Sequence, residues 1–504
     1  MIAPTRDHFE ALKAIVGDKG LLVPAGSGAG VETDIGTGGS DLAVYESCVR
    51  YGRGQAAFVV RPASSAETSQ VLAYCQAAGI TLIPQSGNTG LVGASTPDPS
   101  GTQGVLSFDR LLGTVESATQ GSGNIIFDEE NRSVTVGAGV RLSDLNAFLA
   151  PKGYVFPIDL GADPRIGGMI ATNTGGARFL RYGDVRQNTL GVKVVLADAQ
   201  GTELDLMSGL RKDNTGIDWK HLFIGTTGVL GVVTEAELNV VRLPQQTTAA
   251  LLVPRDEAAV LKLLLEMEER CDTNLTAFEG MSAAAISAAF DHVPSLRNPF
   301  PNGEIPDYVL LVELSRTWAK RESEQSLDEL MEVVLAEIWE DEDAPDQDGP
   351  LENAFIGRPE EMWALRHALS EGVKHAGKLV AFDVSFCRGD LMKFRAFMAT
   401  ELPKKFQNVR ICDFGHVGDG GLHFNLSISN DDPRLNDANF IPSLRNWVVK
   451  IVVEKYHGSF SAEHAIGRSN QSFYDDYTPE KVKKLAAGLK ALTSAGELGA
   501  VKLG

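Results

Sequence analysis

The stretch IPQSGNTGLVGAS, residues 83–95, is the first of three glycine-rich segments that decide the fold. It continues the strand-like ITLI, and Gly87 and Gly90 allow backbone amides to approach a phosphate closely. The second segment is PIDLGADPRIGGMIATNTGG (157–176), and the third is GTTGVLGVVTEAEL (225–238). Alone, each could be an ordinary turn. Between them, short β-branched runs alternate with helical stretches, which predicts a mixed α and β fold.

The net charge, the cysteines and the lack of long apolar runs exclude several classes of protein. The chain has 504 residues with 46 basic and 66 acidic side chains, a formal net charge of −20. This negative charge argues against a protein that binds nucleic acid, and against electrostatic binding to anionic lipid membranes. Five scattered cysteines form neither a disulfide framework nor a zinc-knuckle spacing. With no signal peptide and no transmembrane run, we expect a cytoplasmic protein, with peripheral membrane association left open.

Two other segments are assigned no chemistry. PAGSGAGVE (24–32) is G-x-G-x-G and not the G-x-G-x-x-G of nicotinamide-binding folds, and no helix pattern follows it. It is therefore interpreted as a turn. The acidic run EDEDAPDQDG (340–349) is interpreted as a solvated loop.

A histidine cluster near the C-terminus is the second chemical feature. His416 and His423 flank a glycine-rich turn, and Glu463 precedes His464 in SAEHAIG. Two imidazoles and a carboxylate can form a three-ligand metal site with positions left for substrate. Packed or exposed histidines without a metal are the alternative.

The three glycine-rich segments, in this order, resemble the flavin-binding domain of the vanillyl-alcohol-oxidase (PCMH) type. They are most similar to the FAD-linked D-2-hydroxyacid dehydrogenases, which act on D-lactate, D-2-hydroxyglutarate or glycolate. The resemblance implies an α+β fold: a two-subdomain FAD-binding domain plus an α+β cap domain with an antiparallel sheet. We expect an N-terminal helical segment over 1–50, the FAD-binding domain over 51–243 and the substrate domain over 244–504. The last ~45 residues are expected to return to the flavin interface.

The resemblance also implies which residues contact FAD. They are Pro84, Ser86, Gly87, Asn88, Thr89, Gly90, Pro157, Gly167, Gly168, Thr172, Asn173, Gly176, Gly228, Gly231 and Val233. Some related oxidases attach the flavin to a histidine. Because this chain has no histidine between His8 and His221, we predict noncovalent FAD.

GHVGDGGLHFN and SAEHAIG resemble the family's metal motifs. The resemblance implies His416, His423 and Glu463 as ligands of a divalent metal, zinc or manganese, and His464 as the catalytic base. The resemblance also implies that Asn425 contacts the substrate. The sequence departs from the pattern at Gly421, where asparagine is usual, and at Ala465, where glycine is usual.

The helix-like EEMWALRHALSEG supplies the predicted carboxylate clamp. Arg366 and Ser370 are four residues apart, and the resemblance makes both substrate-binding candidates. A lysine expected in dicarboxylate-specific relatives is replaced by Ala381, and Lys378 stands three residues earlier. A small or apolar D-2-hydroxy acid is therefore as well supported as a dicarboxylate.

The predicted function is metal-assisted oxidation of a D-2-hydroxy acid to the 2-oxo acid, by hydride transfer to FAD. Electrons would pass to a non-oxygen acceptor such as an electron-transfer flavoprotein or a quinone, and a homodimer is left open. The alternatives are an oxygen-using oxidase of the glycolate type, a flavin-binding electron-transfer subunit without its own substrate site, and a nonredox use of the fold as in ether-lipid synthesis.

Overall fold

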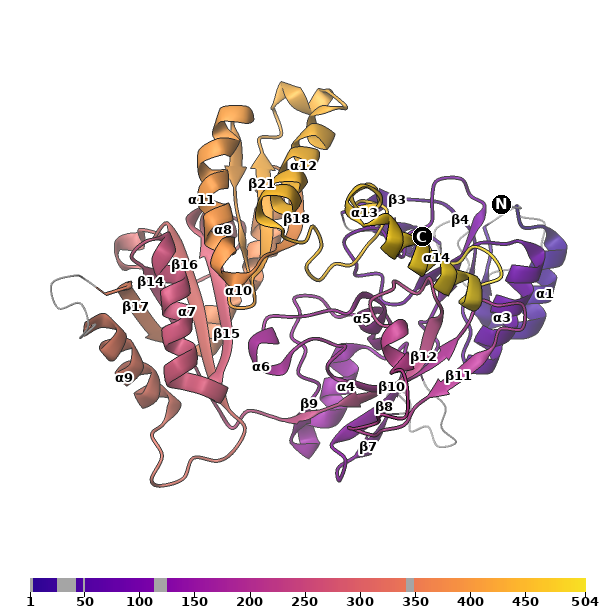
Figure 1. Ribbon diagram of the computed structural model, residues 1–504, viewed down its shortest axis with the longest axis horizontal. Helices are drawn as coiled ribbons and strands as arrows, with labels where there is room; N and C mark the ends of the chain where they lie inside the picture. Colours follow the sequence, from indigo (N-terminus) through magenta and orange to yellow (C-terminus); the bar gives the residue numbers. More distant parts are fainter. Residues whose placement is uncertain (1–2, 25–41, 49, 113–124, 341–348) are drawn as a thin grey trace. The chain divides into compact units, whose positions relative to one another are not determined.

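The computed structural model describes residues 3–24, 42–48, 50–112, 125–340 and 349–504 (Figure 1). The chain forms two compact units. The first unit contains Met1–Gly175, Asp184–Arg242 and Glu463–Gly504, and the second contains Gly176–Gly183 and Leu243–Ala462. The G-x-G-x-G turn (26–30) and most of the acidic run (341–348) lie outside the described residues. No helix in the described part of the chain is long and apolar enough to cross a membrane.

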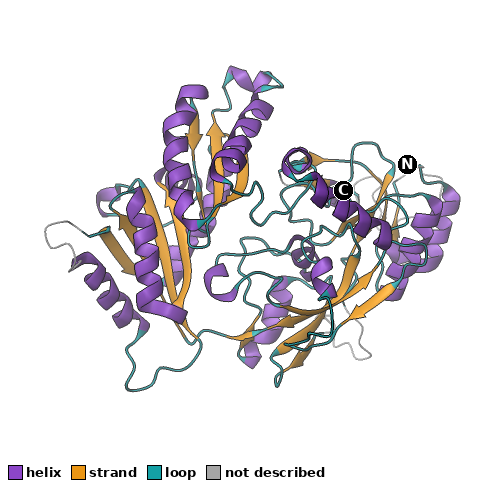
Figure 2. Cartoon of the chain, viewed as in Figure 1, coloured by secondary structure: helices purple, strands orange, loops and turns teal. Residues whose placement is uncertain are grey.

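The first unit is built on two separate sheets (Figure 2). One has the order β1-β4-β6-β5, with β4, β5 and β6 parallel and β1 antiparallel. Its strands are β1 (Leu21–Leu22), β4 (Ala56–Val60), β5 (Leu82–Gln85) and β6 (Gln103–Ser107). The other is antiparallel with the order β11-β10-β12-β8-β7. Its strands are β7 (Ile126–Asp128), β8 (Ser133–Gly137), β10 (Thr189–Val195), β11 (Glu203–Leu206) and β12 (Val232–Asn239).

Helices of the first unit follow their local sequence signals. They include α1 (Arg6–Val16), α3 (Ser65–Ala78), α4 (Leu142–Leu149), α5 (Ile166–Thr172), α13 (Gln471–Tyr477) and α14 (Glu480–Thr493). The stretch SSAETSQVLAYCQAAG offers Ser64 or Ser65 as the N-cap of α3. The structure uses Ser64, whose hydroxyl accepts a hydrogen bond from the Glu67 amide at 3.1 Å. Gly79 ends α3 in the left-handed conformation that favours glycine.

The second unit is one antiparallel sheet covered by helices. The strand order is β17-β14-β16-β15-β20-β21-β18, with β19 also paired to β21. Its strands are β14 (Gln246–Pro254), β15 (Leu275–Ser282), β16 (Tyr308–Arg316), β17 (Leu351–Gly357), β18 (Lys378–Ser385), β19 (Val409–Ile411), β20 (Phe414–Gly415) and β21 (Gly421–Ile428). Every residue of β15 and β16 is buried, which explains the unbroken apolar run YVLLV.

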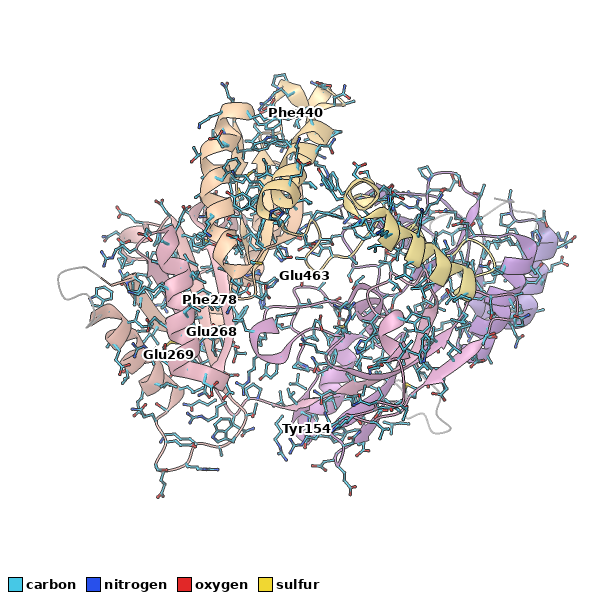
Figure 3. All side chains as sticks on the ribbon, in the orientation of Figure 1. Tyr154, Glu268, Glu269, Phe278, Phe440 and Glu463 are labelled. Atoms are coloured by element: carbon cyan, nitrogen blue, oxygen red, sulfur yellow. The ribbon has the colours of Figure 1, made fainter. Side chains whose placement is uncertain are left out.

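The helices of this unit bury apolar side chains, except for the four-residue α6, which has no buried residue. They are α6 (Phe179–Tyr182), α7 (Glu257–Cys271), α8 (Ala283–His292), α9 (Leu327–Glu340), α10 (Pro359–His375), α11 (Arg388–Lys405) and α12 (Phe440–Lys450). On α10, the helical spacing of Met362, Leu365, Leu369 and Val373 predicts one apolar stripe. All four side chains are buried, in a cluster shared with α8 and β14. The predicted α+β class, with a two-sheet unit and an antiparallel-sheet unit, is confirmed. Tyr154 and Phe278, labelled in Figure 3, are among the largest fully buried side chains.

Candidate active site

The three glycine-rich segments come together in the first unit. A β-carbon built on Gly168 of the second segment would lie 3.3 Å from Ser86 Cβ of the first. One built on Gly228 of the third segment would lie 3.4 Å from Pro84 Cβ. A side chain at position 168 would therefore crowd Ser86, and one at position 228 would be in van der Waals contact with Pro84. Such convergence of bare backbone suits a ligand that is held by amide groups.

Each segment also holds one non-glycine residue in the left-handed backbone region. These are Asn88 (φ 53°), Asn173 (φ 52°) and Thr227 (φ 53°). Such conformations cost of the order of 1–3 kcal/mol and cluster at ligand-binding sites. One per segment is consistent with the predicted cofactor site.

The two asparagines brace their own loops. Asn88 Nδ2 donates to the Val44 and Ser47 carbonyls at 3.1 and 2.8 Å. Asn173 Nδ2 donates to Asp184 Oδ2 at 2.8 Å. Both side-chain amides therefore donate to protein groups and fix the backbone of their loops.

Of the other residues predicted to contact FAD, some lie in loops and some lie in helix α5 or strand β12. Gly87, Thr89 and Gly90 lie in the loop after β5, and nothing lies within 4 Å of a β-carbon built on Gly90. The remaining ones are Gly167 and Thr172 in α5, buried Pro157 before α5, Gly231 before β12, and Val233 within β12. Gly176 belongs to the second unit.

The segment that carries His464 is tied to the first glycine-rich segment. The Ser469 amide donates to the Val92 carbonyl at 3.0 Å, and Arg468 Nε donates to the Thr96 carbonyl at 2.9 Å. A β-carbon on Gly467 would lie 2.3 Å from the Val92 oxygen, so only glycine fits there. These contacts fix the residues after His464 against the predicted flavin loop.

Ala465 occupies a strained position directly after the predicted base. Its φ is 61°, a region that alanine rarely adopts. The buried Asn470 stabilises this turn because its Nδ2 donates to the Ala465 carbonyl at 3.0 Å and its Oδ1 accepts from the Gly467 amide at 2.7 Å. The conformation explains why glycine is usual here in the pattern that the segment resembles.

In the second unit, His416 and His423 lie together as the sequence predicted. His416 follows β20, His423 lies on β21, and their ring centroids are 5.1 Å apart in an edge-to-face arrangement. The turn between them needs glycine at position 420, where φ is 91° and a β-carbon would lie 2.2 Å from the Phe386 carbonyl oxygen. The glycine-rich spacing therefore has a structural cause.

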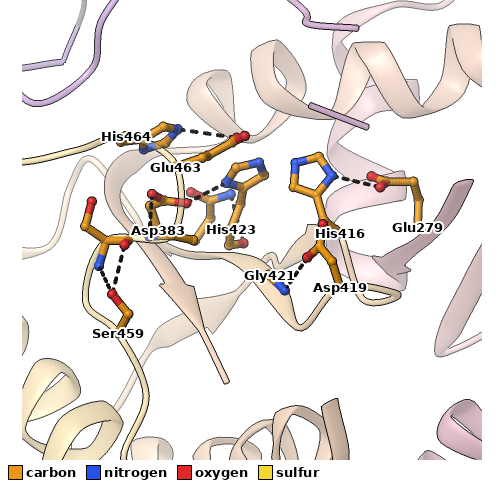
Figure 4. Close-up of polar contacts among 12 residues, drawn as sticks. Glu279, Asp383, His416, Asp419, Gly421, His423, Ser459, Glu463 and His464 are labelled. Atoms are coloured by element: carbon orange, nitrogen blue, oxygen red, sulfur yellow. Dashed lines mark hydrogen bonds and ion pairs between the residues drawn. The ribbon is translucent and has the colours of Figure 1, made fainter. Parts of the chain in front are cut away.

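A buried carboxylate orients His416, and the sequence analysis missed it. Glu279 Oε1 lies 2.8 Å from His416 Nδ1, and Arg366 Nε donates to Glu279 Oε2 at 2.7 Å (Figure 4). Burial alone would raise the pKa of Glu279, but the charges and hydrogen bonds of His416 and Arg366 lower it to about 2. Because the ionised carboxylate can only accept, His416 Nδ1 donates to it, and in the neutral imidazole the lone pair would be on Nε2. A charge inside the apolar strand LTAFEGMS was the signal that could have revealed this residue.

His423 also lies beside a carboxylate. Asp383 on β18 is its register partner on β21, and Oδ1 lies 3.6 Å from His423 Nδ1. Ala381 and Asn425 are the next register pair on the same face. Asn425 Oδ1 is buried and has no hydrogen-bond partner among the described residues. An orphaned acceptor on the same face of β21 as His423 suits a site that receives a polar ligand.

The remaining predicted site residues differ in how far they are buried. Arg366 is buried and bonded to Glu279, whereas Ser370, one turn later on α10, is exposed. Glu463 and His464 are partly buried, and Glu463 Oε1 lies 3.9 Å from His464 Nε2. The Ala462 amide, directly before Glu463, donates to Asp383 Oδ2 at 3.0 Å.

The two-sheet unit with its converging glycine-rich segments is matched by a model of FAD-binding domains. The FAD binding domain model matches residues 56–206, and the model of the C-terminal domain of FAD linked oxidases matches residues 243–493. The chain belongs to this FAD-linked oxidase family, in the branch of the D-2-hydroxyacid dehydrogenases.

Named relatives agree with this assignment. A mitochondrial D-2-hydroxyglutarate dehydrogenase of Arabidopsis thaliana is 31% identical, covering 90% of this chain and 75% of the relative. A Schizosaccharomyces pombe protein with a mitochondrial D-lactate dehydrogenase name is 32% identical, covering 93% and 84%. The expected cytoplasmic location therefore stays a prediction.

Solved structures show the same fold. p-Cresol methylhydroxylase superposes with a TM-score of 0.63 at 16% identity, covering 96% of this chain and 93% of that one. Alkyldihydroxyacetonephosphate synthase superposes with a TM-score of 0.59 at 16% identity, covering 88% and 75%. At these identities the likeness concerns the fold alone.

The flavin is expected to be bound without a covalent link. On precipitation with trichloroacetic acid, the yellow colour should remain in the supernatant, because neither of the first two glycine-rich segments holds a histidine that could attack the ring. Absorbance of supernatant and pellet at the flavin maximum checks this. A yellow pellet after repeated washing would contradict it.

Proposed function

We propose that this enzyme oxidises a D-2-hydroxy acid to the 2-oxo acid, using noncovalent FAD and a divalent metal. The observation that carries the proposal is the pair of histidines beside buried carboxylates, His416 with Glu279 and His423 with Asp383. Metal-bound histidines typically donate their second ring nitrogen to such a group. The donor set therefore fits a metal of the zinc or manganese class, with His416, His423 and Glu463 as ligands.

The bound metal would supply positive charge to the substrate's hydroxyl and carboxylate oxygens, and bound FAD would supply the hydride acceptor. His464 accepts the hydroxyl proton in this proposal. Its position after Glu463 and before the residues tied to the first glycine-rich segment supports that role. Asn425 Oδ1 accepts a hydrogen bond from the substrate.

The environment of Arg366 refines the predicted carboxylate clamp. Its guanidinium is bonded to Glu279, so the formal charge of Arg366 is balanced within the protein. We infer that Arg366 acts mainly by holding Glu279, and that attraction of the anionic substrate rests on the metal. An acidic chain of net charge −20 needs such a local source of positive charge.

Anaerobic flavin bleaching tests the proposal. D-lactate, D-2-hydroxybutyrate and D-2-hydroxyglutarate, each with its L-enantiomer, are added to the FAD-loaded protein before and after treatment with EDTA. Bleaching by D-enantiomers only, abolished by EDTA and restored by Zn²⁺ or Mn²⁺, is the expected result. Bleaching without stereopreference or indifferent to EDTA would contradict the metal-assisted mechanism, and no bleaching by any acid would favour an electron-transfer subunit.

Acceptor choice requires a separate measurement. We propose a non-oxygen acceptor, an electron-transfer flavoprotein or a quinone. Reoxidation of the bleached flavin in air should then be slow and release little hydrogen peroxide, whereas fast stoichiometric peroxide release would identify an oxidase.

A further inference from the structure

Two helices of the second unit, α8 and α10, each end in a histidine. The helices pack closely at Gly372, where a β-carbon would lie 2.6 Å from the backbone of Ala289. His375 follows Gly372 by three residues, and His292 follows Ala289 by three. The close contact therefore brings the last turns of both helices together.

The two imidazole rings stack face to face. Their centroids are 3.8 Å apart, with 12° between the ring planes. Glu371 lies one turn before His375, and each of the three residues offers a ligand atom within 4.8 Å of the others. All three side chains are exposed, so an ion can reach them directly from solvent.

The hydrogen bonding of His375 prepares it as a ligand. Its Nδ1 lies 2.7 Å from the backbone carbonyl of Glu371, which can only accept. The proton therefore resides on Nδ1, and Nε2 presents its lone pair, an arrangement typical of metal-binding histidines.

The electrostatics of the cluster favour a cation. Two helix C-termini place partial negative charge here, and Glu371 adds a carboxylate. Glu371 pairs with Lys374 at 3.2 Å, but an exposed pair of this kind is worth at most about 1 kcal/mol and can be displaced.

We propose that His292, Glu371 and His375 bind a divalent transition-metal ion of the zinc class. Two imidazoles and one carboxylate suit Zn²⁺, Ni²⁺ or Cu²⁺, with water completing the coordination, whereas Mg²⁺ and Ca²⁺ prefer all-oxygen sites. The site shares no residue with the proposed catalytic ligands. His375 lies nine residues beyond Arg366 on α10, roughly 13 Å along the helix axis. A bound ion would cross-link the C-terminal ends of α8 and α10.

The experiment uses the FAD-loaded full chain, freed of metal and titrated with Zn²⁺ by calorimetry. We expect the double variant His292→Ala/His375→Ala to bind one equivalent fewer than the wild type, while D-2-hydroxy acids still bleach its flavin. Glu371→Gln should weaken this equivalent by about tenfold or more. His221→Ala, an exposed histidine outside the cluster, is the matched control and should bind like the wild type.

Variants of the catalytic ligands separate this site from the proposed function. His416→Ala/His423→Ala should retain the Zn²⁺ equivalent that the other double variant loses. Unchanged stoichiometry and affinity in His292→Ala/His375→Ala would overturn the site, whatever the outcome at His416 and His423. Equal binding of Mg²⁺ at the cluster would overturn its assignment to the zinc class.

Discussion

His464→Ala should lose flavin reduction while the protein retains FAD. General-base catalysis contributes about 10²–10⁴-fold, so the single-turnover rate of bleaching by a D-2-hydroxy acid should fall by at least the lower figure. FAD should remain because the predicted FAD contacts come from the three glycine-rich segments and do not include His464. Stopped-flow absorbance under anaerobic conditions measures the rate, and the flavin-to-protein ratio measures retention.

His221→Ala is the control for His464→Ala. His221 lies in the same unit, is exposed and pairs with Asp218 at 3.2 Å, so its loss should leave the bleaching rate unchanged. Full single-turnover reduction by His464→Ala would remove this residue from the role of base. Loss of FAD in the same variant would instead make it a structural residue.

Glu279→Gln should weaken metal binding without removing any proposed ligand. The substitution removes the charge that holds the proton on His416 Nδ1, and loss of such a partner typically costs about 10–100-fold in metal affinity. It also leaves Arg366 buried without its countercharge, which should lower the free energy of unfolding by about 3–5 kcal/mol. Competition with a chromophoric chelator measures the affinity, and thermal melting follows the stability.

Glu313→Gln separates these two effects. Glu313 lies on the neighbouring strand β16, its side chain is as buried as that of Glu279, and it pairs with Arg178 at 2.8 Å. It also accepts from Trp363 Nε1 at 2.6 Å, so its partners are an arginine and a tryptophan and not a proposed metal ligand. We therefore expect a similar loss of stability with unchanged metal affinity. If Glu279→Gln bound metal as tightly as the wild type, Glu279 would have no positioning role.

The sequence by itself determined what local chemistry controls. The glycine-rich segments predicted loops that bring backbone amides close to a phosphate, because such an approach restricts the residue type within a few positions. Their resemblance to a known family added the flavin and the α+β fold. Ser64 as the N-cap of α3 and the buried stripe of α10 were also readable, since a cap and a helical period involve neighbours within one or two turns.

Tertiary structure alone decided the surroundings of the site. Glu279 meets His416 across 137 positions of sequence, and Asp383 meets His423 only through the register of β18 and β21. The packing of α10 on β15 gives Arg366, the predicted substrate clamp, a buried carboxylate partner in Glu279. A side chain's residue type limits the bonds that it can form, but strand order and helix packing decide which distant group it meets. The sequence therefore named the proposed ligands, and the fold revealed the carboxylates that orient them.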